Sequence, residues 1–345
     1  MTDTKPELPS PPQSHPHKTM RVCSLGPTFG SHAPQPAQWL RDKGWEVVIR
    51  PRGFKVTPET VKEFLKDCDG MIPGMTKIDG DIMRALPRLK VIAVHGVGVD
   101  HIDVQAAEEL GIAVCNVPGG NALSVAEFTI GLLFALARQI PQADRLVKQG
   151  GWHPVVGCRL GGRTLGIVGL GQIGKEVAIM AKCLGMKLMA CGRTHDREFT
   201  GRHGISWVSL EELLAESDFV SLHLPGTPET KGVIQAPQLA MMKPGAYLLN
   251  LGRGELINEA DLLESLQSGH LAGAALDVFC EEPVGDNPLA KLPQVIATPH
   301  NASFTVEVAY EVGFLCVRNL AAVLEGRMPP NLVNRWKPPQ GQPGE

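Results

Sequence analysis

Short apolar runs alternate with longer amphipathic runs along most of this chain, and that alternation limits the possible folds more than any other feature. The apolar runs have the length of buried strands, and the amphipathic runs are long enough for helices. Strands that alternate with helices predict parallel sheets with right-handed crossover connections. A first set of expected strands comprises 21–25, 45–50, 70–73, 90–95 and 113–117. A second set comprises 164–168, 187–191, 205–208, 219–222, 246–251, 273–278 and 294–298.

Helices are expected between these strands and between the two sets. The sequence predicts one long helix over 121–150, and a last helix over 305–325 that ends the fold. Ser209, followed three residues later by Glu212, predicts a capping box at the start of another helix. The pattern therefore favours an α/β protein with two doubly wound parallel sheets.

The two ends of the chain lack this pattern. Residues 1–19 are rich in Pro, Ser, Thr and His and contain almost no large apolar side chains. Such a segment buries too little surface to offset the loss of chain entropy. We therefore predict a disordered tail over 1–19, and a second tail over 335–345.

Charge and cysteine content exclude several classes of protein. Lys plus Arg is 33 and Asp plus Glu is 36, a net charge of -3 without a basic block, which argues against a nucleic-acid partner. The longest apolar stretch, 128–137, is about half of what crosses a bilayer, so no membrane partner is expected. The 8 cysteines include no CxxC pair, which argues against a metal site or a disulfide framework. Reduced thiols and no signal peptide predict a cytoplasmic protein.

The strongest local motif is a glycine-rich loop that follows the strand 164–168 and opens an amphipathic helix. Gly169 permits a tight turn, Gly171 lets a pyrophosphate approach the backbone, and Gly174 lets the helix pack closely. Gln172 and Ile173 lie at the start of that helix, where N–H groups and the helix dipole favour phosphate. We predict a dinucleotide site, with a plain glycine turn as the alternative.

The strand after the glycine loop ends at Cys191, and the next residues bear on the choice of cofactor. An NAD-selective site usually places Asp or Glu here for the ribose hydroxyl, and 192–194 contain no acid. Arg193 can pair with a 2′-phosphate and Thr194 can donate a hydroxyl. The loop favours NADP(H) and leaves NAD(H) possible, because Arg193 can also be a solvated residue that tolerates either cofactor.

Reactive side chains follow three strands of the second set. Arg253 comes after 246–251, Asp277 and Glu282 after 273–276, and His300 after 294–298. Ligands of doubly wound sheets bind at such strand ends. An Arg, a carboxylate and a His suit reduction of a 2-oxo acid: the Arg holds the carboxylate, and the His delivers a proton. Each residue alone also fits a solvated loop.

Taken together, these motifs resemble the D-isomer-specific 2-hydroxyacid dehydrogenase family, most closely its phosphoglycerate-dehydrogenase-like branch. The resemblance extends over about 21–334. The motifs that carry it are HGVGVDHID at 95–103, NVPGGNALSVAE at 116–127, the glycine loop, NLGRG at 250–254, AALDVFCEEP at 274–283, and TPH at 298–300.

The resemblance assigns roles to single residues. It implies that Arg253 binds the carboxylate and carbonyl of the substrate. His300 is then the acid/base, and Glu282 orients it. Independently of the resemblance, a carboxylate beside an imidazole favours its protonated form near neutral pH. By the same resemblance, Asp277 contacts the nicotinamide amide. The backbone amides of Val97 and Gly98 help to hold the substrate carboxylate.

The resemblance also implies a domain layout. A flavodoxin-like substrate-binding lobe comprises 20–120 and 302–334, a Rossmann nucleotide-binding lobe comprises 121–301, and the cleft lies between them. The helix near 121–150 is expected to form a homodimer interface, although a helix that is apolar on most faces can equally be core. The apolar side chains expected there are Phe128, Leu132, Leu133, Phe134 and Leu136.

One departure from the family pattern bears on the substrate. Phosphoglycerate-type members carry an Arg after the strand near 70–73, whereas this chain has no basic residue there before Lys77. Glyoxylate, hydroxypyruvate or a similar small 2-oxo acid is therefore expected. D-3-phosphoglycerate dehydrogenase is the alternative, with Lys77 or a partner's Arg138 as the compensating cation. A non-catalytic, dinucleotide-sensing corepressor is the alternative of another class, because such proteins can retain the Arg, Glu and His.

Overall fold

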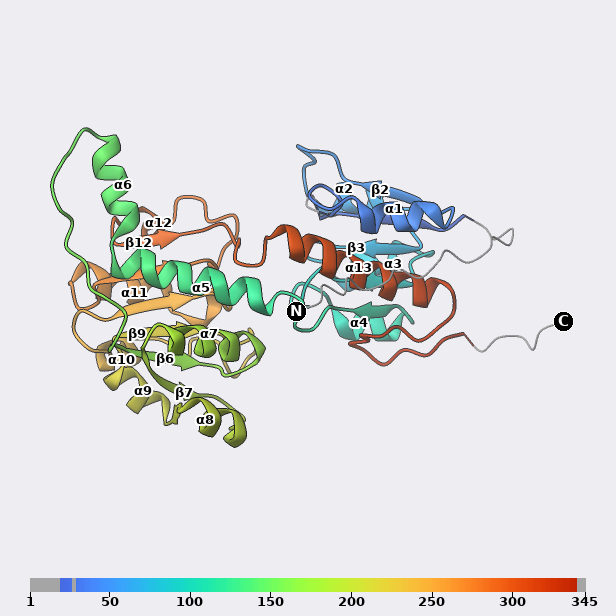
Figure 1. Ribbon diagram of the computed structural model, residues 1–345. Coiled ribbons are helices and arrows are strands. Elements are labelled where there is room, and N and C mark those ends of the chain that lie inside the picture. Colours follow the sequence, from blue (N-terminus) through green and yellow to red (C-terminus); the bar gives the residue numbers. More distant parts are fainter. Residues whose placement is uncertain (1–18, 27–28, 340–345) are drawn as a thin grey trace, which may run out of the picture. The chain divides into compact units, whose positions relative to one another are not determined.

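The computed structural model describes residues 19–26 and 29–339, which form two compact units (Figure 1). The inserted unit comprises Ala122–Phe304. The discontinuous unit comprises the described residues before it, up to Asn121, and those after it, from Thr305. Each unit is an α/β structure around one parallel sheet, which confirms the predicted fold class.

The sheet of the discontinuous unit has the order β2-β1-β3-β4-β5, with all its strand pairs parallel. This is a doubly wound order that reverses between β1 and β3. Its strands are β1 (Arg21–Ser24), β2 (Glu46–Ile49), β3 (Gly70–Ile72), β4 (Val91–Ala93) and β5 (Ala113–Cys115). One face is covered by α1 (Gln35–Asp42) and α13 (Val306–Leu324). The other is covered by α2 (Pro58–Leu65), α3 (Gly80–Arg84) and α4 (Val104–Glu109).

The sheet of the inserted unit has the order β12-β11-β10-β9-β6-β7-β8, again parallel throughout. Its strands are β6 (Thr164–Val168), β7 (Lys187–Cys191), β8 (Ser206–Trp207), β9 (Phe219–Leu222), β10 (Tyr247–Asn250), β11 (Gly273–Leu276) and β12 (Val295–Ala297). The order reverses between β6 and β9, and doubly wound sheets bind ligands at the carboxyl ends of the strands at such a point.

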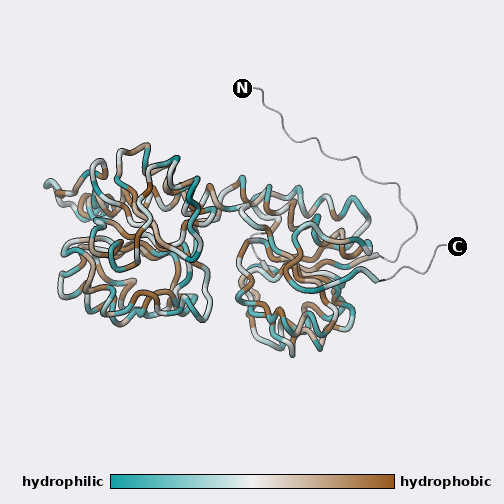
Figure 2. Tube along the Cα trace, turned by 90° about the horizontal axis from the view of Figure 1, so that it is seen from below, coloured by the Kyte–Doolittle hydropathy of each residue, from teal (hydrophilic) through white to brown (hydrophobic). Residues whose placement is uncertain are grey.

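Helices cover both faces of this second sheet, and hydrophobic residues line each unit's sheet (Figure 2). One face packs against α5 (Ala122–Ala137) and α7 (Gln172–Cys183). The other packs against α9 (Leu210–Glu216), α10 (Ala236–Met241) and α11 (Glu259–Gln267). The remaining helices are α6 (Ile140–Lys148), α8 (Arg197–His203), α12 (Pro288–Lys291) and the short η1 (Gly254–Leu256). Ser209 caps α9 by accepting a hydrogen bond from the backbone N–H of Glu212 at 3.1 Å.

The predicted single helix over 121–150 is wrong. Two helices, α5 and α6, meet there at 61°. Gln139 adopts the left-handed backbone conformation between them, with φ 51°. Pro141, in the first turn of α6, has no N–H, and its ring would clash with the preceding turn of a continuous helix. Among the described residues, no single helix meets the length and hydropathy of a membrane span, although the bent pair α5–α6 does.

Part of the apolar surface expected on α5 for a dimer is internal. Leu132, Leu133 and Leu136 are buried in the core against the sheet of their own unit. Apolar side chains on a helix can pack in the core or contact a partner subunit, and the number of apolar residues does not distinguish these two roles. Phe128 packs partly against the same core, whereas Phe134 is exposed.

The segment 335–339 is not the disordered tail that its composition predicts. The indole Nε1 of Trp336 donates to the carbonyl oxygen of Gly111 at 3.1 Å, and the ring packs against the core of the discontinuous unit. The backbone N–H of Arg335 donates to Glu108 at 3.1 Å. One aromatic side chain is enough to bind a polar segment to the surface. The predicted tail residues 1–18 and 340–345 lie outside the described residues.

Candidate active site

The glycine-rich turn between β6 and α7 has the geometry that each glycine predicts. Gly169 has φ 98°, a conformation that other residues rarely adopt, and a Cβ there would lie 2.8 Å from the carbonyl oxygen of His223. At Gly174, a Cβ would lie 2.3 Å from the carbonyl oxygen of Gly169. These two glycines therefore let the helix, the turn and the end of β9 pack closely.

Gly171 differs from its neighbours because a Cβ there would meet no atom within 4 Å. It is the N-cap of α7, with no side-chain cap, and Gln172 and Ile173 are the first two residues of that helix. Gly171 and Gln172 are exposed, so open space faces the helix N-terminus. The turn thus fits the diphosphate of a dinucleotide, which favours free N–H groups and close approach to the backbone.

The predicted cofactor-selecting residues Arg193 and Thr194 are exposed on the loop after β7. The acid that follows them, Asp196, already has two partners within the protein. Its carboxylate pairs with Lys175 at 2.6 Å and accepts from the backbone N–H of Phe199 at 3.0 Å. Asp196 is the N-cap of α8.

Sequence reasoning missed a second acid in this region, Glu229, because it lies on the loop after β9. Its pKa is lowered, first by a hydrogen bond from the Thr227 hydroxyl, then by its own backbone N–H, and also by the charge of Arg193. Arg193 and Glu229 therefore share one region of the surface.

His300 and Glu282 form a direct hydrogen bond. Nδ1 of His300 lies 2.9 Å from Oε2 of Glu282, and the two side chains are 28% and 33% exposed. Burial raises the pKa of Glu282, but the hydrogen bond and charge of His300, the N–H of Phe279 and the charge of Arg253 lower it more, so it lies below its ordinary value. An ionised carboxylate only accepts, so Nδ1 carries a hydrogen and Nε2 remains available for proton transfer.

The turn that carries His300 is held by the buried carboxylate of Asp277. His300 has a left-handed backbone, with φ 52°. The oxygens of Asp277 accept from the Thr298 hydroxyl at 2.5 Å, from the N–H of Asn301 at 2.7 Å and from the N–H of Ala302 at 2.9 Å. Three donors of one turn thus converge on Asp277 and stabilise an uncommon conformation. A contact of Asp277 with a nicotinamide amide stays a prediction.

Arg253 precedes η1 in an extended conformation, and its loop packs on the loop that carries Glu282. A Cβ at Gly254 would lie 2.0 Å from the carbonyl carbon of Phe279, so glycine is required for this close contact. Nη1 of Arg253 donates to the carbonyl oxygen of Gly252 at 2.8 Å. The structure brings Arg253, Glu282 and His300 to one edge of the sheet, at the ends of β10, β11 and β12.

Val97 and Gly98 belong to the discontinuous unit and follow β4. The carbonyl oxygen of Val97 accepts from Nδ2 of Asn116 at 2.8 Å. Within residues 19–26 and 29–339, neither the N–H of Val97 nor that of Gly98 donates to a protein acceptor. Both N–H groups are thus available to a ligand, and their contact with the substrate carboxylate stays a prediction.

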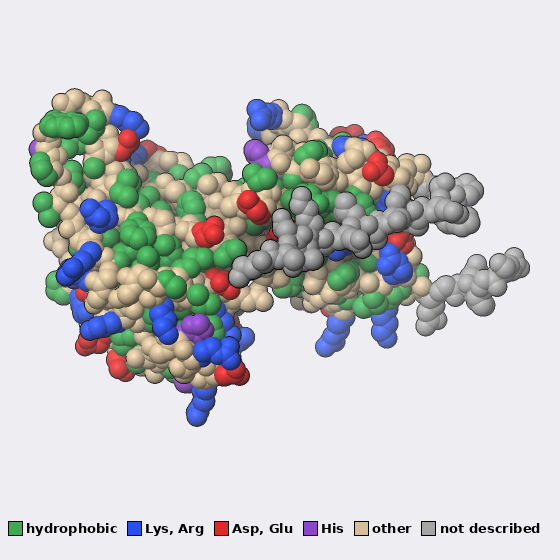
Figure 3. Space-filling view, in the orientation of Figure 1, with side chains coloured by type: hydrophobic (Ala, Val, Ile, Leu, Met, Phe, Trp, Pro, Cys, Tyr) green, Lys and Arg blue, Asp and Glu red, His purple; other side chains and the backbone are tan. Residues whose placement is uncertain are grey.

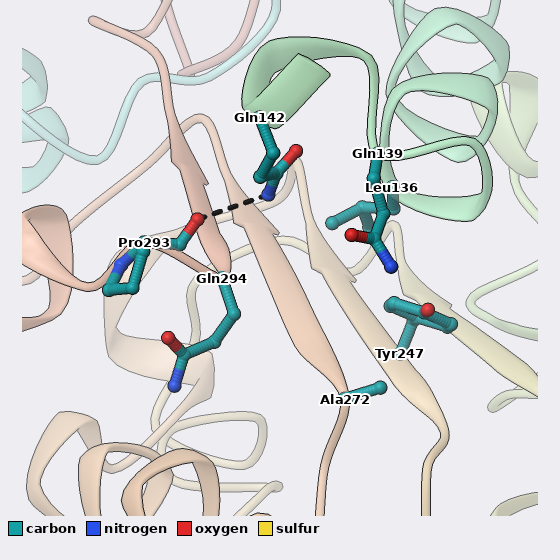
Figure 4. Close-up of a pocket in the computed structure, with 7 residues that line it drawn as sticks. All are labelled: Leu136, Gln139, Gln142, Tyr247, Ala272, Pro293 and Gln294. Carbon is teal, nitrogen blue, oxygen red and sulfur yellow. Dashed lines mark hydrogen bonds between the residues drawn. The ribbon is translucent and has the colours of Figure 1, made fainter. Parts of the chain in front are cut away.

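Figure 4 shows a small pocket of about 200 Å³ in the inserted unit. It lies where β10, β11 and β12 begin, at the opposite edge of the sheet from the catalytic candidates. Tyr247, which begins β10, and Gln294, which precedes β12, line it, and Gln142 donates to the carbonyl oxygen of Pro293 there at 3.0 Å. The pocket is therefore separate from the site at the carboxyl ends of the strands. No group of three or more His, Cys, Asp or Glu in the described part of the chain is placed to hold a metal ion.

A doubly wound unit with a diphosphate-binding turn, and with Arg, Glu and His at neighbouring strand ends, defines an oxidoreductase that uses a nicotinamide dinucleotide. Residues 130–302 match the family model "D-isomer specific 2-hydroxyacid dehydrogenase, NAD binding domain". The chain belongs to the D-isomer specific 2-hydroxyacid dehydrogenase family.

Relatives carry two different activity names. A glyoxylate reductase of Aeropyrum pernix is 41% identical over 88% of this chain and 94% of the relative. A D-3-phosphoglycerate dehydrogenase of Methanocaldococcus jannaschii is 42% identical over 84% of this chain but only 56% of the relative. Among solved structures, an NADPH-dependent glyoxylate/hydroxypyruvate reductase of Sinorhizobium meliloti, in complex with NADP and malonate, has a TM-score of 0.78. It is 31% identical, and the match covers 92% of this chain and 97% of that one.

Proposed function

We propose that this 2-hydroxyacid dehydrogenase acts as a reductase of small 2-oxo acids such as glyoxylate or hydroxypyruvate. The observation that carries the proposal is the His300–Glu282 hydrogen bond beside the loop of Arg253. This set supplies a proton donor, a carboxylate that is hydrogen-bonded to it, and a cation for the substrate carboxylate. It needs a hydride donor, and the turn around Gly171 fits the diphosphate of one.

The chemistry divides between the cofactor and these side chains. When bound, the reduced nicotinamide supplies the hydride for the carbonyl carbon. Arg253 binds the carboxylate of the substrate with two N–H groups and polarises the carbonyl. His300 donates the proton from Nε2 to the carbonyl oxygen and is left as neutral imidazole. Its Nδ1 still donates to Glu282, which holds the ring in place through both protonation states.

The loop after β3 supports a small substrate without a phosphate. Pro73 to Thr76 contain no cation, and the first one, Lys77, is exposed. A Cβ at Gly74 would lie 2.7 Å from Cα of Gly26, so the loops after β3 and β1 pack closely. D-3-phosphoglycerate is the second candidate, supported by the relatives of that name at similar identity.

NADPH is the cofactor that we propose as preferred. Arg193 and Thr194 are exposed, and Asp196 is paired with Lys175. The relative of Sinorhizobium meliloti is described as NADPH-dependent. Arg193→Ala is expected to weaken NADPH binding and to leave NADH binding unchanged. Dissociation constants of both cofactors for both proteins test this, and tighter binding of NADH by the unmodified protein would contradict it.

We further propose a homodimer through α5 and α6. Phe134, Ile140, Val147 and Trp152 are exposed large apolar side chains on these helices or just after them. Figure 3 shows hydrophobic side chains over this face of the inserted unit. Apolar patches of this kind mark protein interfaces. Sedimentation of the unmodified protein and of Ile140→Asp tests it: a monomeric unmodified protein would contradict the proposal.

The cytoplasm is the proposed location, because all eight cysteines are unpaired, as in reducing compartments.

The experiment for the main proposal is a spectrophotometric panel of 2-oxo acids with NADPH and NADH. We expect consumption of NADPH with glyoxylate or hydroxypyruvate, and consumption about 100-fold slower or less with His300→Ala. Tight cofactor binding without turnover of any 2-oxo acid would instead favour a dinucleotide-sensing binding protein.

A further inference from the structure

Asn250, the last residue of β10, has a buried side chain that binds the turn leading to Arg253. The side chain of Asn250 is 1% exposed. Its Nδ2 donates to the carbonyl oxygen of Arg253 at 2.8 Å. Its Oδ1 accepts from the backbone N–H of Gly252 at 3.1 Å. The side-chain amide of Asn250 therefore binds two backbone groups of the same turn, the N–H of Gly252 and the carbonyl of Arg253.

The surroundings of this turn leave it little freedom. A Cβ at Gly252 would lie 2.7 Å from the carbonyl oxygen of Leu224, and Gly254 packs directly on the backbone of Phe279. The loop on the other side is also close, because a Cβ at Gly226 would lie 3.1 Å from Cγ of Arg253. These contacts confine the turn, and the Asn250 amide sets the direction of the Arg253 carbonyl within it.

We propose that Asn250 is a positioning residue for Arg253, which holds the main chain of 250–253 so that the guanidinium meets the substrate carboxylate. The inference rests on the proposed function, because it assumes that Arg253 binds that carboxylate. Asn is the shortest side chain that offers both an N–H donor and a carbonyl acceptor. Asp has the same shape but would place an acceptor against the carbonyl of Arg253.

Asn250→Asp is therefore the test variant, and Asn334→Asp is its matched control. Asn334 makes the same pair of bonds in the discontinuous unit: it donates to Ile112 O at 2.8 Å and accepts from Val114 N at 2.9 Å. We expect Asn250→Asp to raise KM for the 2-oxo acid and lower kcat, by roughly 10- to 100-fold in kcat/KM, because small displacements of a positioned group are costly. NADPH affinity should stay unchanged, and Asn334→Asp should lower only the thermal midpoint.

A double-mutant cycle separates positioning from a general structural role. If Asn250 acts through Arg253, Asn250→Asp adds no further loss of kcat/KM to Arg253→Ala. Additive losses would overturn the inference, and so would normal kinetics of Asn250→Asp. If Asn250→Asp does not fold, Asn250→Ser, which keeps a short hydroxyl acceptor, is measured in its place with the same two criteria.

The unmodified protein decides whether a failure concerns Asn250 or the function itself. Reduction of 2-oxo acids by the unmodified protein, together with normal Asn250→Asp kinetics, contradicts the role of Asn250 alone. Absence of reduction with every 2-oxo acid contradicts the proposed function, and the role of Asn250 then falls with it.

Discussion

Replacing Glu282 by Gln should shift the pH dependence of catalysis while leaving the shape of the site intact. Oε2 of Glu282 lies 2.9 Å from Nδ1 of His300, and Oε1 accepts from the N–H of Phe279 at 3.1 Å. The pKa of Glu282 lies below its ordinary value, so this carboxylate is ionised at neutral pH. Gln keeps a hydrogen bond to the imidazole and removes the charge.

The expected shift follows from the charge that the substitution removes. Nδ1 of His300 donates to Glu282 in both protonation states, so the preference for the imidazolium comes from its attraction to the carboxylate. Two unit charges about 4 Å apart attract each other by about 1 kcal/mol in water and more strongly at a partly buried site, so the substitution removes about 1–1.5 kcal/mol of preference for the imidazolium. About 1.4 kcal/mol corresponds to one pH unit, so the limb of kcat/KM should move to lower pH by about one unit.

The pH limb of kcat/KM should move to lower pH in both directions of the reaction, but the effect on activity differs between them. Reduction needs His300 protonated, so the variant should lose reduction at a lower pH than the unmodified enzyme. Oxidation needs the neutral imidazole, so the variant should keep more oxidation activity at mildly acidic pH.

The assay is a pH profile of kcat/KM in both directions, for the unmodified enzyme, Glu282→Gln and Glu281→Gln. Glu281 is exposed and directly precedes Glu282, which makes it a matched control for charge. Superimposable profiles for Glu282→Gln and the unmodified enzyme would refute the role of Glu282. A shift with Glu281→Gln alone would show that the role belongs to Glu281 and not to Glu282.

Three further predictions concern single parts of the site. His300→Ala should lower kcat by about 100-fold or more, since it removes a positioned general acid, and near-normal turnover at neutral pH would reject that role. Arg253→Ala should weaken binding of oxamate, an inert 2-oxo acid analogue, in calorimetry with cofactor present; unchanged affinity would disprove the carboxylate clamp. Gly171→Ala places its methyl group in open space and should weaken NADPH binding at an unchanged thermal midpoint. Gly174→Ala should instead cost about 1–3 kcal/mol of stability, and similar behaviour of the two variants would contradict the loop assignment.

The fold class was predictable because its signals are local. Every expected strand is present, three of them with the predicted bounds and the others shorter, since an apolar run between turn residues is identified without knowledge of its neighbours. The Glu282–His300 pair was predictable for a related reason. Parallel strands bring their carboxyl ends to one edge, so residue types that follow successive strands become neighbours.

The features that sequence reasoning missed depend on contacts between distant segments. The charge of Arg193 lowers the pKa of Glu229 only because the loop after β9 lies beside the loop after β7. Trp336 packs against its unit only because the carbonyl of Gly111 and an apolar surface lie beside it. The break before α6 could have been predicted, because Pro141 disfavours a continuous helix. The prediction of a single helix gave more weight to the apolar pattern on either side of it.

The strand ends also explain how the sheet aligns Arg253 with His300. The carbonyl of Asn250 accepts from the N–H of Asp277 at 3.0 Å, and the carbonyl of Asp277 accepts from the N–H of His300 at 2.8 Å. Two of these residues also bind a turn through a buried side chain. Asn250 binds the turn that carries Arg253, and Asp277 binds the turn that carries His300. The register of β10, β11 and β12 therefore fixes both groups relative to each other. Since Asp277 belongs to both connections, a change there should disturb the Arg and the His together, whereas a change at Asn250 should disturb the Arg alone.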